Sequence, residues 1–118
     1  EPALFNLARV YQKKKEWIDS NNMFKEFIKV KGAGLSAYSE MAWNNLMSGN
    51  MEQAVTLYEK VLSFKPTNRI ALINLAKIYY RLGKYKISRS YIDRALKQSL
   101  SQAQSSDLKN LIKKLSSH

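Results

Sequence analysis

The side chains that usually carry catalysis are few in this sequence and stand far apart. Cysteine is absent, and the one histidine is His118, which we interpret as a frayed tail residue or a tag remnant and not as a ligand. Glu16, Asp19 and Glu26 share one predicted helix, but no set of partner groups for metal or acid–base chemistry accompanies them. The sequence therefore predicts a protein that is not an enzyme and that holds no metal or cofactor.

Positive charge is the strongest chemical signal in the composition. The 118 residues include 20 Lys or Arg and 9 Asp or Glu, which gives a formal net charge of +11. Such an excess favours acidic partners, among them acidic peptides, anionic lipids and nucleic acids. The excess is concentrated in residues 69–102, which contain eight basic residues and one acidic residue.

Two groups of basic residues could bind an anionic partner, and each has a simpler interpretation. Lys13-Lys14-Lys15 closes a predicted helix, where cations interact favourably with the helix C-terminus. The other group follows the predicted helix 85–97, and we interpret it as a solvated face. Helical repeats that read RNA use uniform polar residues at fixed places, and such uniformity is not seen here, so nucleic acid is not the expected partner. The second group comprises Lys84, Lys86, Arg89, Arg94 and Lys97.

An internal repeat predicts the elements that position these side chains. Divided at residues 1, 35 and 69, the chain gives three blocks that align without a gap at a period of 34. Places 4, 7, 8 and 11 of each block fall on one helical stripe, and places 17, 20, 24 and 28 form a second stripe. The aligned sets are Leu4/Tyr38/Leu72, Leu7/Met41/Leu75, Ala8/Ala42/Ala76, Tyr11/Asn45/Tyr79, Trp17/Met51/Tyr85, Ser20/Ala54/Ser88, Phe24/Tyr58/Ile92 and Ile28/Leu62/Leu96.

A break between the two stripes predicts a turn in each block. The breaks are Lys14-Lys15, Ser48-Gly49-Asn50 and Leu82-Gly83-Lys84, and glycine there can adopt the left-handed conformation that ends a helix. Each block is therefore expected to be a hairpin of two antiparallel helices, which small residues at places 8 and 20 allow to approach closely. The predicted helices are 3–14, 17–30, 36–48, 52–63, 69–82 and 85–97.

The end of the chain predicts one further helix over about 106–116. Residues 99–104 are polar and small, which indicates a connector, and residues 105–107 supply the expected N-cap. Four apolar residues at i, i+3, i+4 and i+7 should cover the third block: Leu108, Leu111, Ile112 and Leu115. The result is an all-α protein of about seven helices, with repeats at 1–34, 35–68 and 69–102 and a connector and C-terminal capping helix at 103–118.

The repeats resemble the tetratricopeptide repeat family. The likeness covers residues 1–102, and the last helix is similar to the family's C-terminal capping helix. Phe27 and Val61 depart from it at a place that is usually small, and Asn45 replaces a usual aromatic residue. The resemblance implies a right-handed superhelix, an α-solenoid of antiparallel helix hairpins whose first helices line a concave groove that binds a peptide or protein. Block three carries it most clearly, through Leu72, Leu75, Ala76, Tyr79, Gly83, Tyr85, Ala95 and the preceding Pro66.

The resemblance also implies which residues line the groove, namely places 2, 5, 9, 12 and 13 of each block. Their mixture of aromatic, aliphatic and cationic groups favours a peptide with apolar anchors and acidic flanks, bound chiefly by Trp, Tyr and Arg. In the alternative interpretation, Trp43 and Tyr80 only cover neighbouring helices. The candidates are Phe5, Arg9, Gln12, Lys13, Ser36, Ser39, Trp43, Leu46, Met47, Ile70, Ile73, Lys77, Tyr80 and Arg81.

One family subtype, the carboxylate clamp that binds chaperone C-terminal tails, does not fit these residues. The clamp needs Lys and Asn at places 5 and 9 of the first block, Asn at place 6 of the second, and Lys and Arg at places 2 and 6 of the third. This sequence has Phe5, Arg9, Glu40, Ile70 and Asn74 there. A chaperone C-terminal tail is therefore not expected as a partner.

The expected function is that of a protein-interaction scaffold or adaptor, whose oligomeric state the sequence leaves open. Two alternatives remain: a structural segment of a longer repeat array used for assembly or self-association, and a binder of RNA or lipid through the basic third repeat. No apolar run approaches the ~20 residues of a membrane span, and no signal peptide is visible, so we expect a cytoplasmic location. The start at Glu1 indicates a fragment or a processed form.

Overall fold

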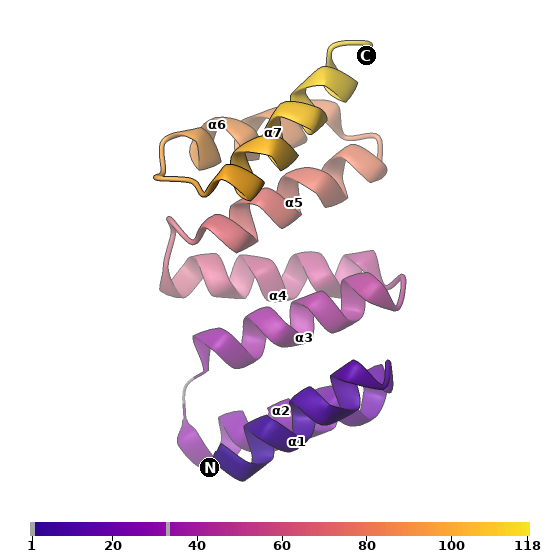
Figure 1. Ribbon diagram of the computed structural model, residues 1–118, viewed down its shortest axis with the longest axis vertical. Helices are drawn as coiled ribbons and strands as arrows, with labels where there is room; N and C mark the ends of the chain where they lie inside the picture. The colour runs from indigo at the N-terminus through magenta and orange to yellow at the C-terminus, as the bar shows by residue number, and fades with distance from the viewer. Residues whose placement is uncertain (1, 33) are drawn as a thin grey trace. The chain divides into compact units, whose positions relative to one another are not determined.

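The computed structural model describes residues 2–32 and 34–118, and its regular elements there are all α-helices (Figure 1). The all-α prediction is confirmed. The chain divides into two compact units, Glu1–Phe64 with α1 to α4 and Lys65–His118 with α5 to α7, and each is described by itself. The helices are α1 (Pro2–Lys13), α2 (Trp17–Lys31), α3 (Leu35–Met47), α4 (Met51–Phe64), α5 (Arg69–Arg81), α6 (Tyr85–Leu96) and α7 (Gln102–Leu115).

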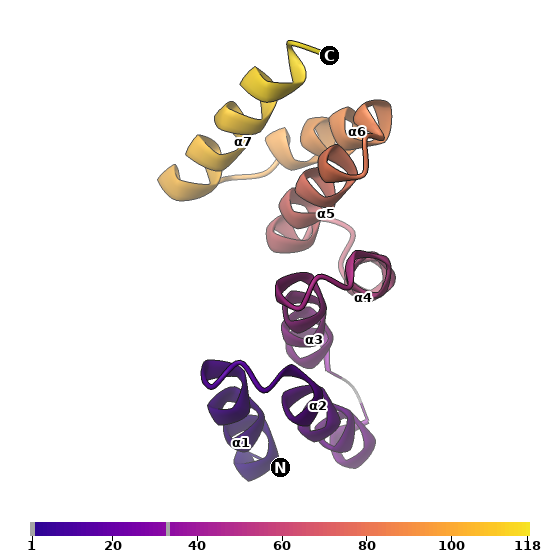
Figure 2. The same cartoon turned by 90° about the vertical axis from the view of Figure 1, so that its right-hand side faces the viewer.

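The first unit consists of the hairpins α1–α2 and α3–α4, with α3 packed against α2 (Figure 2). Its small residues are fully buried, as the predicted close approach of the helices requires: Ala8, Ala42 and Ala54 have no exposed surface. A core cluster of Ala8, Phe24, Ala37 and Met41 joins α1, α2 and α3. Leu57 of α4 packs against this cluster, so the unit has one shared core.

Each hairpin turn contains one residue in the left-handed backbone region. The φ angles are 60° at Lys15, 86° at Gly49 and 76° at Gly83, which are equivalent places of the three blocks. Glycine adopts this conformation without steric cost, whereas a residue with a Cβ is strained there by about 1–2 kcal/mol. The first turn is therefore closed at the cost of local strain that the other two avoid.

The second unit consists of the hairpin α5–α6 and the closing helix α7, which packs against both (Figure 1). α5 is the most deeply buried helix of this unit, with Leu72, Leu75 and Ile78 exposed by 1% or less. Asn68 caps its start, since its side-chain oxygen accepts a hydrogen bond from the Ala71 backbone N–H at 2.9 Å. This hydrogen bond fixes the residue at which α5 begins, and with it the position of the buried stripe along the helix.

The closing helix begins at Gln102, so the prediction of a connector through residue 104 and a helix from about 106 was wrong. Ser101 and Gln104 form a capping box: Gln104 N–H donates to Ser101 Oγ at 3.1 Å, and Ser101 N–H donates to Gln104 Oε1 at 3.0 Å. Two backbone donors that the helix would leave unpaired are thus satisfied. The small polar residues that suggested a loop are the first turn of α7.

Some residues predicted to be buried are exposed. Leu108, Leu111 and Leu115 are buried as predicted, but Ile112 is 41% exposed. Leu7 of α1 and Leu96 of α6 are likewise 42% and 52% exposed, although their equivalents Leu75 and Leu62 are buried. The predicted helical stripes are correct in position, but no helix of the described residues fully covers the stripes at these three side chains.

Candidate functional site

The predicted groove residues lie on the first helix of each hairpin, as the repeat register requires. Because the chain forms two units, these residues fall into two sets. The first unit contains Phe5, Arg9 and Lys13 on α1 and Ser39, Trp43 and Met47 on α3, and the second contains Ile73, Lys77, Tyr80 and Arg81 on α5.

The first set includes an exposed apolar surface on α3. Trp43 is 41% exposed and Met47, one helical turn further on, is 44% exposed. Other residues of α3, namely Met41, Ala42 and Asn44, are buried and anchor the helix in the first unit. Trp43 and Met47 therefore project from a helix that is packed into the unit, which favours a contribution of an aromatic anchor to binding energy.

Polar contacts hold α1 against α3 beside this surface. Gln12 Nε2 donates to Glu40 Oε1 at 2.9 Å and to Asn44 Oδ1 at 2.8 Å, and Arg9 lies 3.6 Å from Glu40 Oε2. Glu40 thus offsets the charge of Arg9. Lys13 is exposed and has no ion pair among the described residues, so it is the free cation at this place of α1.

A buried hydrogen-bond network continues from Gln12 into the first unit. Asn44 is fully buried and donates through Nδ2 to Ser20 Oγ and Asn21 Oδ1, both at 2.9 Å, while Ser20 Oγ donates to the Ala8 carbonyl at 2.8 Å. No buried side-chain nitrogen or oxygen in the described part of the chain lacks a partner. Sequence reasoning missed this network, although an Asn at place 10, where the third block has Ile78, was a visible signal.

Phe5 packs against the core of the first unit. Its ring makes edge-to-face contacts with Phe24 and Phe27, with 5.2 Å between centroids in each case. It is partly buried against the core cluster of the first unit. The bulky Phe27, which departs from the family pattern, therefore packs against an aromatic ring of α1.

Ser39, the remaining predicted residue of α3, is half-buried.

The predicted residues of α5 are mostly engaged within the second unit. Ile73 is 4% exposed, so its assignment to a groove was wrong, and it is a core residue. Lys77 Nζ lies 2.9 Å from Asp107 Oδ2 of α7, an ion pair that ties the two helices. Tyr80 is half-buried, with 5.5 Å between its ring centroid and that of Tyr85, and Arg81 is exposed.

His118 is packed against the second unit, which corrects its interpretation as a frayed tail residue. Its ring stacks on Tyr85 with 4.3 Å between centroids and meets the edge of Tyr80 at 5.9 Å. Arg89 donates to the carbonyl oxygens of His118 at 3.0 Å and Leu115 at 2.9 Å. Arg89 therefore holds the end of α7, where carbonyl groups lack helical partners.

Two further arginines of the basic second unit make structural contacts, whereas three of its lysines form no ion pair in the described part of the chain. Arg94 donates to the Pro66 carbonyl at 3.3 Å and lies over the Tyr91 ring, while Arg69 donates to the Ser99 carbonyl. Lys84, Lys86 and Lys97 are exposed and form no ion pair among the described residues. Residues 65–118 contain 12 basic and 2 acidic side chains, so most of the net charge belongs to this unit.

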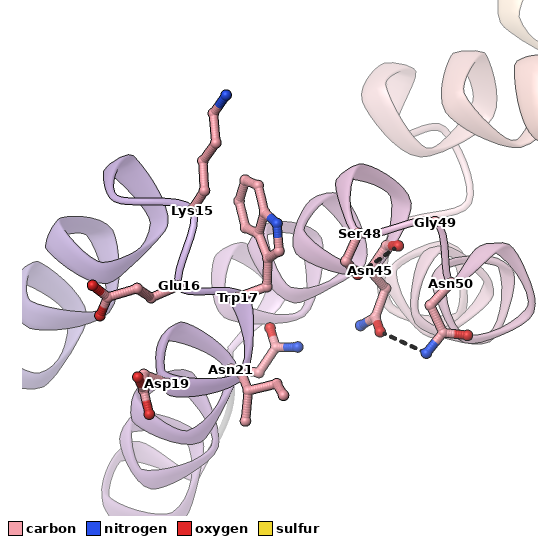
Figure 3. A pocket seen from close by; sticks show the side chains of 10 residues that line it. Lys15, Glu16, Trp17, Asp19, Asn21, Asn45, Ser48, Gly49 and Asn50 are labelled. Carbon is pink, nitrogen blue, oxygen red and sulfur yellow. Dashed lines mark hydrogen bonds between the residues drawn. The ribbon is translucent and has the colours of Figure 1, made fainter.

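A pocket of about 730 Å³ lies between the α1–α2 turn and the α3–α4 turn (Figure 3). The half-buried Trp17 stands beside the 77% exposed Ile18, and Asn50 Nδ2 donates to Asn45 Oδ1 at 3.3 Å. These amides can bond peptide groups, but no nucleophile–base pair is present among the lining residues. Sequence reasoning took Trp17 for a stripe residue and overlooked the asparagines of the turns. The lining is Lys15, Glu16, Trp17, Ile18, Asp19, Asn21, Asn45, Ser48, Gly49 and Asn50.

Neither a cluster of metal-ligating side chains nor a helix that could span a membrane is found in the described ranges 2–32 and 34–118. Three or more metal-ligating side chains do not come together anywhere in these ranges. None of their helices combines the length and the apolar character that crossing a membrane requires.

Known proteins place this chain in a family. The sequence model described as tetratricopeptide repeat matches residues 45–115. The chain belongs to the tetratricopeptide repeat family. Among curated proteins, none gives a significant match.

Solved structures share the fold of this tetratricopeptide repeat protein. The TPR domain of Arabidopsis OM64 superposes with a TM-score of 0.85 at 23% identity, covering 99% of this chain and 94% of that chain. The Sgt2 TPR domain from Aspergillus fumigatus gives 0.82 at 18% identity, covering 98% and 78%. PcrH, solved in complex with the chaperone binding region of PopB, gives 0.81 at 15% identity, covering 93% and 92%. The predicted fold class is thereby confirmed.

Proposed function

We propose that this chain is a non-enzymatic interaction module that binds a peptide or protein segment along the surface formed by α1 and α3. The observation that carries the proposal is the exposed pair Trp43 and Met47 on α3, a helix that is packed into the first unit through its buried residues. The PcrH structure supports it, since a protein of this fold is seen there with a region of another protein. The proposed repeats remain 1–34, 35–68 and 69–102, with α7 as the cap.

The chemistry of the α1–α3 surface favours a particular kind of partner segment. An apolar or aromatic side chain would pack on Trp43 and Met47, and an acidic neighbour would meet Lys13. Arg9 contributes less charge than the sequence suggests, because Glu40 lies 3.6 Å away. A chaperone C-terminal tail remains outside the proposal, since the residues at the clamp places do not match.

The test is the affinity for a partner captured with the intact chain and identified by mass spectrometry. Trp43→Ala should weaken binding by about 2 kcal/mol or more, roughly 30-fold, with an unchanged helical circular dichroism spectrum. Ile18→Ala is the matched control, because Ile18 is more exposed but lies on α2. Normal binding by Trp43→Ala would refute the proposal. Loss of binding only in Ile18→Ala would place the site at the pocket of the hairpin turns.

A second candidate function, binding of an anionic polymer such as RNA or anionic lipid, rests on the charge of residues 65–118. These residues include 12 basic and 2 acidic side chains. This candidate predicts that Lys84→Glu with Lys86→Glu abolishes binding and that affinity falls steeply with salt through counterion release. Arg89 is kept in this variant, because its contacts with the end of α7 are structural.

A further inference from the structure

The groove between α6 and α7 is an apolar surface separate from α1 and α3. It has a volume of about 370 Å³. Its floor includes Ile92 and Leu115, which are buried, and its rims include Leu96, 52% exposed, and Ile112, 41% exposed. Two large apolar rims above a buried apolar floor form a continuous patch, which differs from the scattered exposed apolar residues of ordinary surfaces.

The first unit shows what kind of element covers such a floor. By the repeat register, Ile92 and Leu96 of α6 correspond to Phe24 and Ile28 of α2. Phe24 has no exposed surface, and Leu57 of the helix α4 packs on the cluster that contains it. The described residues of the second unit supply no helix in the corresponding place. The groove thus has the floor of a helix-packing site.

The charged residues near the groove indicate which residues a bound helix would carry on either side of its apolar stripe. Helical spacing puts Lys86 one turn before Arg89 on α6 and Lys109 one turn before Ile112 on α7. Both lysines are exposed and have no ion pair among the described residues. The lining itself contains one acidic side chain, Asp93, and one basic side chain, Arg89, so the excess positive charge comes from the two lysines outside the lining. A partner with acidic residues beside its apolar stripe is therefore complementary.

We propose that the groove between α6 and α7 binds an amphipathic helix of a partner protein, with apolar residues at i, i+3 or i+4 and i+7 and Asp or Glu on its flanks. This mode, a helix laid into an apolar groove, obtains its affinity from a few apolar anchors. It uses residues that the proposed α1–α3 site does not.

The probe is a fluorescein-labelled peptide with the sequence of residues 50–64, the α4 segment, carrying Lys60→Glu. Fluorescence anisotropy with the whole chain should show saturable binding. Leu96→Ser and Ile112→Ser should each weaken it at least about tenfold, because both remove a rim of the groove. Ile87→Ser is the matched control: Ile87 is also on α6 and also 41% exposed, but it does not line the groove. Trp43→Ala should leave the affinity unchanged, which separates this site from the proposed function.

Several results would overturn the proposal. The first is an absence of saturable binding, and the second is an affinity of the Leu96→Ser and Ile112→Ser variants equal to that of the unmodified chain. A third is a dimer of the chain alone, in sedimentation velocity, that Ile112→Ser dissociates, since the groove would then be occupied by a second copy. A probe with Gln in place of its acidic residues should bind more weakly, and equal binding would overturn the assignment of acidic flanks.

Discussion

Two interfaces in this protein add a helix to a hairpin, and they differ in how much of their contact is buried and polar. α3 meets α1–α2 through the apolar core cluster of the first unit and also through a buried polar network centred on Asn44 and Ser20. α7 meets α5–α6 through Leu108, Leu111 and Leu115, each at most 5% exposed. Burial of apolar side chains stabilises an interface but does not depend on the direction of each contact. A buried polar group is tolerated only where hydrogen-bond partners are within reach. The repeat architecture accommodates both kinds of interface.

The serine at place 20 does not by itself create the polar interface. Ser20 donates to the Ala8 carbonyl at 2.8 Å, and Ser88 donates to the Ala76 carbonyl at 2.7 Å, so both hydroxyls are satisfied within their own hairpin. The difference is Asn44, whose amide needs acceptors on α2. We interpret Asn44 as the residue that fixes the register of α3 on α2, because a shifted helix would leave its amide unpaired.

The largest expected effect is on the apolar interface. Leu111→Ala should lower the free energy of unfolding by about 2–5 kcal/mol, through lost burial and the cavity left behind. Urea unfolding measures it, with Ile112→Ala as the matched control, since Ile112 is adjacent but 41% exposed. Equal losses for the two variants would show that α7 is not held by its buried leucine stripe.

The polar interface should respond less, and its response should depend on its partners. Asn44→Ala should cost about 1–3 kcal/mol, because it breaks the bonds to Ser20, Asn21 and Gln12 in a buried place. Asn44→Ile combined with Ser20→Ala, the pair found at equivalent places as Ile78 and Ala54, should cost less than Asn44→Ala. Chemical denaturation of the variants tests this order, and a larger loss in the double variant would contradict it.

The smallest expected effect concerns the turns of the two units. Lys15→Gly should raise the stability by about 0.5–1 kcal/mol, because Lys15 has φ 60° where Gly49 and Gly83 stand in the other hairpins. Gly83→Lys should lower it by a similar amount. Thermal unfolding followed by circular dichroism measures both, and an unchanged or lower melting temperature for Lys15→Gly would mean that the Lys15 backbone is not strained.

The sequence by itself determined the helices. Apolar stripes with a helical period and breaks at equivalent turns are local signals, so the six helices of the hairpins were predicted to within one residue at each end. α7 was misplaced at its start because Ser and Gln suit both loops and capping boxes. The repeat register also put Trp43 and Met47 on α3 as neighbours on one face.

Only the tertiary structure decided which of those side chains are exposed and which are paired. Ile73 occupies a groove place yet is buried, and Phe5 is partly buried against the core of its unit. Arg9 and Lys77 are paired with Glu40 and Asp107. The ion pair of Lys77 joins residues 30 apart in the chain, and the bond from Gln12 to Asn44 joins residues 32 apart. Helix formation depends on neighbours within about one turn, whereas exposure and pairing depend on partners that come close only when the helices pack.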